Sequence, residues 1–102
     1  MQDNNMNKEI SPQQLAIRRR ELSVEYKENM KELAEIQKRK AFKIIELMAE
    51  HKTVSKAELY WNTTEDGQRE IELVMISRGL LELMRAVKSE LEVKQAEGWG
   101  NF

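Results

Sequence analysis

The fold of this 102-residue chain is decided by residues 18–40, RRRELSVEYKENMKELAEIQKRK. A helix advances about 100° per residue, so this stretch places its side chains on three separate stripes. Such a helix buries its apolar stripe against a partner and leaves two oppositely charged flanks. The basic stripe holds Arg20, Lys27, Lys31 and Lys38; the acidic stripe holds Glu21, Glu25, Glu28, Glu32 and Glu35; the apolar stripe holds Leu22, Tyr26, Met30, Leu33 and Ile36.

Helical spacing continues on both sides of this stretch. Ser11 followed by Pro12 is a good helix start, and no further proline or glycine interrupts the pattern before Gly67. The spacing predicts one helix from residue 12 to about Glu50 or His51, roughly 55 to 60 Å long. Because one long helix cannot fold back on itself, we expect a homo-oligomer. Its expected interface consists of Leu22, Tyr26, Met30, Leu33, Ile36, Leu80, Leu83, Val87 and Leu91.

The segment after this helix has two interpretations. Ser55 and Glu58 have the spacing of a capping box, which predicts a short helix over residues 56–61. Alternatively, ELYWN and QREIELVMI flank TTEDG, whose Asp66-Gly67 pair is a turn signal, and would form a β-hairpin. Both interpretations make residues 62–67 a surface turn.

The last predicted element is an amphipathic helix from about Gln68 to Gln95. Gly79 lies in its middle and weakens it by about 1 kcal/mol relative to alanine. We therefore expect another helix to approach closely at Gly79. The apolar positions follow a near-heptad spacing, as in a coiled coil: Leu73, Ile76, Leu80, Leu83, Val87 and Leu91.

Composition favours the same class of protein. Charged residues make up 34% of the chain and apolar residues 40%, which suits helices rather than a disordered polar chain. We predict an all-α protein with a long N-terminal helix, a short connector and a C-terminal amphipathic helix, assembled as a helical homo-oligomer. Residues 1–10 are expected to form a flexible tail, and residues 11–102 a single helical domain.

Several kinds of chemistry have no support in the sequence. The absence of cysteine excludes disulfides and thiolate metal sites and fits a reducing cytoplasm. No apolar run reaches membrane-spanning length. The chain also has a single histidine and lacks a phosphate-cradling glycine loop. We predict neither an enzyme nor a cofactor or metal site, and we expect His51 to place a favourable cation at a helix end.

Nucleic-acid binding has better support. Residues 8–43 carry ten Lys or Arg against six Glu, whereas residues 44–102 carry seven basic against eleven acidic groups. Cations that follow a backbone, next to aromatic rings that stack on bases, are typical of single-strand binding. Of the adjacent rings Tyr60 and Trp61, we expect one to be core and one exposed. The candidate contacts are Lys38, Arg39, Lys40, Lys43, Lys52, Lys56, Tyr60 and Trp61.

The segment 56–97 resembles the UvsY family of phage recombination mediators. The residues that carry the resemblance are Lys56-Ala57, Leu59, Tyr60-Trp61, Leu80-Leu81, Ala86-Val87-Lys88-Ser89 and Glu97. The resemblance implies a small helical protein that forms rings and loads a recombinase onto single-stranded DNA covered by binding protein. It also implies that Lys56 contributes to DNA binding. Glu58 departs from the pattern, because a second basic residue would be expected there.

Two functional interpretations follow. The favoured one is a phage or prophage accessory of recombination or replication that binds single-stranded DNA and a recombinase or single-strand-binding protein in the bacterial cytoplasm. The alternative is a non-catalytic protein-interaction module, such as a phage inhibitor of a host enzyme or an assembly or scaffolding factor. A basic half and an acidic half could equally pair between copies of the chain.

Overall fold

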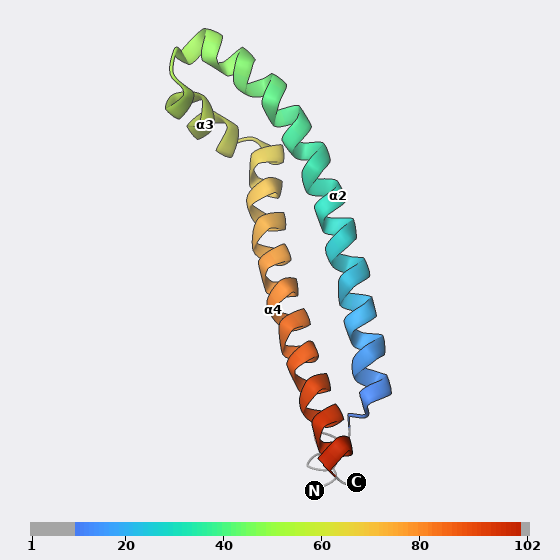
Figure 1. Cartoon of the computed structure of the whole chain (residues 1–102). Helices are drawn as coiled ribbons and strands as arrows, with labels where there is room; N and C mark the ends of the chain where they lie inside the picture. Colours follow the sequence, from blue (N-terminus) through green and yellow to red (C-terminus); the bar gives the residue numbers. More distant parts are fainter. Residues whose placement is uncertain (1–9, 101–102) are drawn as a thin grey trace, which may run out of the picture. The chain divides into compact units, whose positions relative to one another are not determined.

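The computed structural model describes the backbone of residues 10–100 and the side chains of residues 10–97. The described chain forms three helices, α2 (Pro12–His51), α3 (Val54–Asn62) and α4 (Glu65–Gly100), shown in Figure 1. This confirms the all-α class and the long helix at each end, and it replaces the alternative β-hairpin with helices. The expected tail at residues 1–10 lies outside the described residues, except for Ile10.

The start of α2 is capped as its sequence predicts. Ser11 Oγ accepts a hydrogen bond from the Gln14 backbone N–H at 3.1 Å, and Gln14 Oε1 accepts one from the Ser11 N–H at 2.9 Å. This reciprocal pair is a capping box, which satisfies two amides that the first helical turn leaves free. At the other end, Lys52 follows His51 with a φ of 65°, the left-handed conformation that turns a chain away from a helix.

The segments between the helices, residues 52–53 and 63–64, cap the next helix with other residues than the sequence predicts. Thr53, not Ser55, caps α3, since its side chain accepts from the Lys56 N–H at 3.2 Å. The next helix begins earlier than expected, because Thr64 Oγ1 accepts from the Gly67 N–H at 3.0 Å. Only Thr63 and Thr64 therefore separate α3 from α4. Asp66-Gly67 lies in the first turn of α4, where an acidic side chain favours the helix dipole.

The chain divides into two compact units, each built from a part of α2 and a part of α4. In the first unit, which takes in α2 up to Tyr26 and α4 from Leu80 onward, the core is a short apolar seam between the two helices. This seam contains the buried residues Leu15, Leu22, Leu80 and Val87, with Tyr26, Met84 and Leu91 packed beside them.

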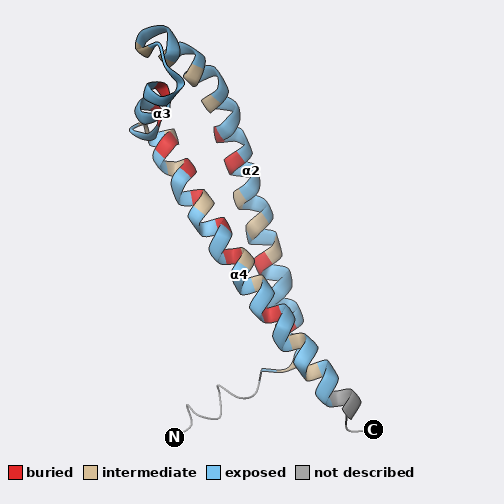
Figure 2. Cartoon of the chain, turned by 60° about the vertical axis from the view of Figure 1, so that its left-hand side comes forward, coloured by how far each residue is buried: buried red, intermediate tan, exposed pale blue. Residues whose placement is uncertain are grey.

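The second unit spans residues 27–79 and includes all of α3. Its core brings α2, α3 and α4 together around Trp61, which is 2% exposed. Figure 2 shows the buried positions of α2 and α4 on the sides that face each other. The cluster contains Leu33, Ile36, Trp61 and Leu73, with Ile44, Leu47 and Val74 packed against it.

These two cores correct the predicted oligomer interface. Leu22, Leu33, Ile36, Leu80 and Val87 are buried within one chain, and Tyr26 and Leu91 pack against the first core. The connector lets α4 fold back beside α2, so the long helix finds its partner in its own chain. Each buried Leu, Ile or Val contributes about 1.5 to 3 kcal/mol, so the contact within the chain stabilises most of this stripe. Met30 and Leu83 remain exposed, at 38% and 45%.

The glycines of α4 also differ from expectation. A Cβ on Gly79 would meet no atom of the described chain within 4 Å, so no helix of the same chain makes the expected close approach there. Gly67 shows the opposite situation. A Cβ there would overlap the Trp61 carbonyl oxygen and lie 2.9 Å from Asn62 Cα, so only glycine fits where α4 begins against the end of α3.

We predict opposite effects of alanine at these two glycines. Gly79→Ala should raise the free energy of unfolding by about 1 kcal/mol, because alanine has the higher helix propensity. Gly67→Ala should lower it by about 1 to 3 kcal/mol, because backbone atoms cannot move away cheaply. Urea unfolding followed by circular dichroism measures both. Equal effects of the two substitutions would contradict the packing described here.

Candidate nucleic-acid interface

The basic triplet 38–40 does not form one basic surface. Consecutive residues of α2 point about 100° apart, and each member of the triplet has a different neighbour. Lys38 extends outward with 74% of its side chain exposed, 3.6 Å from Glu35. Arg39 reaches Asp66 of α4, and Lys40 reaches Glu70 of α4 at 3.3 Å. Two of the three predicted phosphate contacts are therefore already paired with carboxylates.

Two arginine forks join α2 to the start of α4. Arg39 donates from Nε and Nη2 to the two carboxylate oxygens of Asp66, at 2.8 and 3.1 Å. Arg69 donates in the same way to Glu32, at 2.7 and 3.0 Å, and also contacts Glu72. These hydrogen bonds lower the pKa of Asp66 and of Glu32 below their ordinary values and raise the pKa of both arginines.

Trp61 is a core residue, which corrects its assignment as a nucleic-acid contact. Its ring is enclosed, and its Nε1–H donates to Glu70 Oε1 at 2.9 Å. Glu70 is 9% exposed and accepts from both Trp61 and Lys40. A buried carboxylate is stable only with such hydrogen-bond donors. Removing the indole would therefore leave Glu70 with one donor fewer in a buried site. No base can stack on this ring in the folded chain.

Tyr60 has the exposed ring of the pair, which confirms that one ring is core and the other is not. The ring is 51% exposed and stacks on His51, with the ring centroids 3.8 Å apart. Lys52 and Lys56 are exposed in the same connector. Lys43 is also exposed, and its ammonium lies 3.2 Å from Glu46. The connector, which consists of residues 52–64 and includes α3, thus keeps an aromatic ring and two lysines at the surface.

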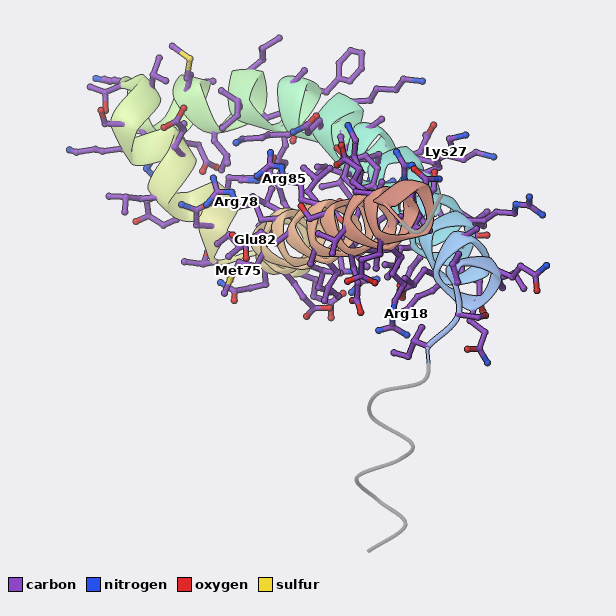
Figure 3. The ribbon with its side chains drawn as sticks, turned by 60° about the horizontal axis from the view of Figure 1, so that its bottom comes forward. Arg18, Lys27, Met75, Arg78, Glu82 and Arg85 are labelled. Atoms are coloured by element: carbon purple, nitrogen blue, oxygen red, sulfur yellow. The ribbon has the colours of Figure 1, made fainter. Side chains whose placement is uncertain are left out.

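A second group of lysines was not included among the predicted contacts. Lys27 and Lys31 are exposed on the same stripe of α2 as Lys38, and Lys27 projects from the helix in Figure 3. Among the described residues, neither makes an ion pair within 4.0 Å, and Lys38 meets only Glu35. We call Lys27, Lys31 and Lys38 the outer lysine stripe. The sequence already places these lysines on the basic stripe, but the predicted basic contacts are lysines and arginines that are close in sequence.

Other features of the described chain add no chemistry. A depression of about 470 Å³ is lined by Arg39, Lys43, Trp61, Thr64, Glu65 and Asp66, whose mixed charges do not select an anion. Among the described residues, no three His, Asp or Glu side chains are grouped so that they could hold a metal ion. None of the described helices combines the length and the apolar character that crossing a membrane requires.

Comparison of this chain with protein-family models, with curated proteins and with solved structures finds no match. Its function therefore has to be inferred from its own residues.

The arginine forks predict a loss of stability in acid. Because Glu32 and Asp66 have a lowered pKa in the folded chain, their contribution is present above the ordinary values of 4.5 and 3.8 and is lost as the pH falls through the folded values. The double variant Glu32→Gln, Asp66→Asn should be less stable than the native chain near neutral pH, and this difference should shrink in acid. Thermal unfolding over a pH series measures this.

Glu90→Gln with Glu92→Gln is the matched control, because both glutamates are exposed and make no ion pair among the described residues. This variant should keep the native dependence on pH. If both double variants lose the same amount of pH dependence in their melting temperature, overall charge, and not the arginine forks, controls the response to acid.

Proposed function

We propose that the protein binds single-stranded nucleic acid through the outer lysine stripe and the connector, as a non-catalytic accessory of phage or prophage recombination or replication. The observation that carries this proposal is the outer lysine stripe, whose cations are exposed while the neighbouring Arg39 and Lys40 are occupied by carboxylates. Among the described residues Lys27 and Lys31 make no ion pair, and exposed cations on one face are what a phosphate backbone requires.

The spacing of the stripe suits a flexible backbone. Lys27 and Lys31 are four residues apart, which is about 6 Å along a helix, and Lys38 follows after about 10 Å more. A single strand can follow such a line without adopting a fixed shape. The contacts are to phosphates, so affinity depends strongly on salt and little on base sequence.

The connector supplies the second element of the proposed site. Tyr60 offers a ring for base stacking, and Lys52 and Lys56 lie near it in the sequence. The resemblance of Lys56-Ala57 to the DNA-binding segment of UvsY-like mediators supports the same location. That resemblance also supports a recombinase or a single-strand-binding protein as a partner in the bacterial cytoplasm.

A protein-interaction module is the second candidate. Leu59 and Met75 are each 66% exposed, and the Met75 side chain extends away from α4 in Figure 3. Large apolar side chains left in water favour contacts with another protein. An inhibitor of a host enzyme or a scaffolding factor would need such a surface and no lysine stripe.

The decisive experiment removes the charges of the outer lysine stripe. The triple variant Lys27→Gln, Lys31→Gln, Lys38→Gln should bind a labelled oligothymidine much more weakly than the native chain. Its slope of log affinity against log salt should fall by about 2, since each lost phosphate contact removes about 0.7. Fluorescence anisotropy over a salt series gives both quantities.

The matched control removes three exposed or half-exposed charges from α4: Arg85→Gln, Lys88→Gln and Lys94→Gln. This variant should bind nearly as well as the native chain if the stripe, and not overall charge, is responsible. Equal losses in the two variants would refute the stripe as the site. No binding by the native chain at low salt would leave the protein-interaction role.

Tyr60 gives a separate prediction. Stacking of a base on an aromatic ring contributes about 1 to 3 kcal/mol, so Tyr60→Ala should weaken oligonucleotide binding roughly tenfold or more. Trp61→Phe should instead lower the melting temperature, because it leaves Glu70 without the indole donor. Anisotropy and thermal unfolding of both variants separate the two roles. Unchanged affinity in Tyr60→Ala would exclude the ring from the site.

A further inference from the structure

The outer side of α2 carries an apolar patch in the second unit. Phe42 is 74% exposed and Ile45 is 69% exposed, the highest values among the large hydrophobic residues that the structure describes. Ala41, Met48 and Ala49 are also exposed nearby on the helix. Neither hydrophobic cluster of the folded chain contains any of these residues. The patch is therefore left in water by the fold.

The patch follows the spacing of a coiled-coil seam. Glu35, Lys38, Phe42, Ile45 and Ala49 are separated alternately by three and four residues, which is the pattern of heptad positions a and d. The inner stripe of the same stretch, with Ile36, Ile44 and Leu47, is used by the core of the second unit. This stretch of α2 therefore has two seams, and only the inner one is covered.

We propose that a second copy of this chain docks on the outer seam in antiparallel orientation. A two-fold axis between positions 43 and 44 sets Phe42 of each copy against Ile45 of the other, which pairs an a position with a d position. The same register sets Lys38 against Ala49. Because the contact uses the same patch on both copies, it closes with two chains.

Charge selects this orientation. In a parallel pair each seam residue would meet its own copy, which sets Lys38 against Lys38 and Glu35 against Glu35. In the antiparallel pair, Lys38 lies within about 5 Å, along the axis, of Glu46 in the other copy, and the two-fold axis repeats this pair. Ala41 and Met48 flank the other side of the seam with apolar surface. The antiparallel register therefore avoids both like-charged contacts of the parallel pair and still sets apolar residues against each other.

The dimer does not require nucleic acid, but the two proposals share Lys38, which lies in the seam of the dimer and leaves Lys27 and Lys31 for phosphates. Its test is the mass of the particle. Sedimentation equilibrium of the native chain at hundreds of micromolar should approach twice 12.0 kDa, the mass of one chain. The variant Phe42→Glu, Ile45→Glu should remain a monomer with native helicity, since both side chains are exposed in the single chain.

The control is Leu59→Glu with Met75→Glu, which changes two equally large exposed residues elsewhere in the second unit. It should dimerise like the native chain. A native chain that stays monomeric at the highest concentration overturns the proposal. A dimer that survives Phe42→Glu with Ile45→Glu overturns it as well.

The orientation has its own test, because the chain contains no cysteine. Chains with Lys38→Cys mixed with chains with Ala49→Cys should form a disulfide-linked dimer on mild oxidation. Each variant alone should not, because the antiparallel register separates the two copies of either position by about 16 Å. Linkage of Lys38→Cys chains alone, as efficient as in the mixture, would overturn the antiparallel register.

Discussion

Glu70 joins the three helices of the second unit through a single carboxylate. It belongs to α4, accepts the indole N–H of Trp61 from α3, and lies 3.3 Å from the ammonium of Lys40 on α2. A carboxylate that is 9% exposed is costly without such donors. The positions of Trp61 and Lys40 therefore depend on each other through Glu70. This one site therefore engages an aromatic ring and a cation within the fold.

The helices could be predicted from spacing, but the partner of the long helix could not. An apolar stripe indicates only that one face of a helix is buried. The same residues could form a contact between chains or within one chain. The connector decides that α2 packs within its own chain. There Lys52 turns the chain away from α2, and Thr53 and Thr64 cap the following helices. Capping by Thr53 rather than Ser55 shifts the start of α3 by two residues. This degree of detail exceeds what propensity can fix.

The candidate site illustrates a different limit. Adjacent basic residues look like a patch in the sequence, but on a helix they fan out, and Arg39 and Lys40 point to carboxylates that lie 27 and 30 positions later. Pairing over such distances cannot be read without the fold. Lys27, Lys31 and Lys38 stay at the surface on one face of α2, because they are four and seven positions apart. Periodicity is therefore the more reliable guide to a helical interface than adjacency.

The left-handed conformation of Lys52 has an energetic consequence. Residues other than glycine occupy this region at a cost of about 1 to 2 kcal/mol, because the Cβ atom crowds the following carbonyl oxygen. Glycine is the usual solution after a helix. With lysine instead of glycine at position 52, the folded chain is less stable by this backbone cost, and a long cationic side chain stands at the turn. Such a conformation persists only where the surrounding structure holds it, and here Lys52 is fixed between the end of α2 and the start of α3.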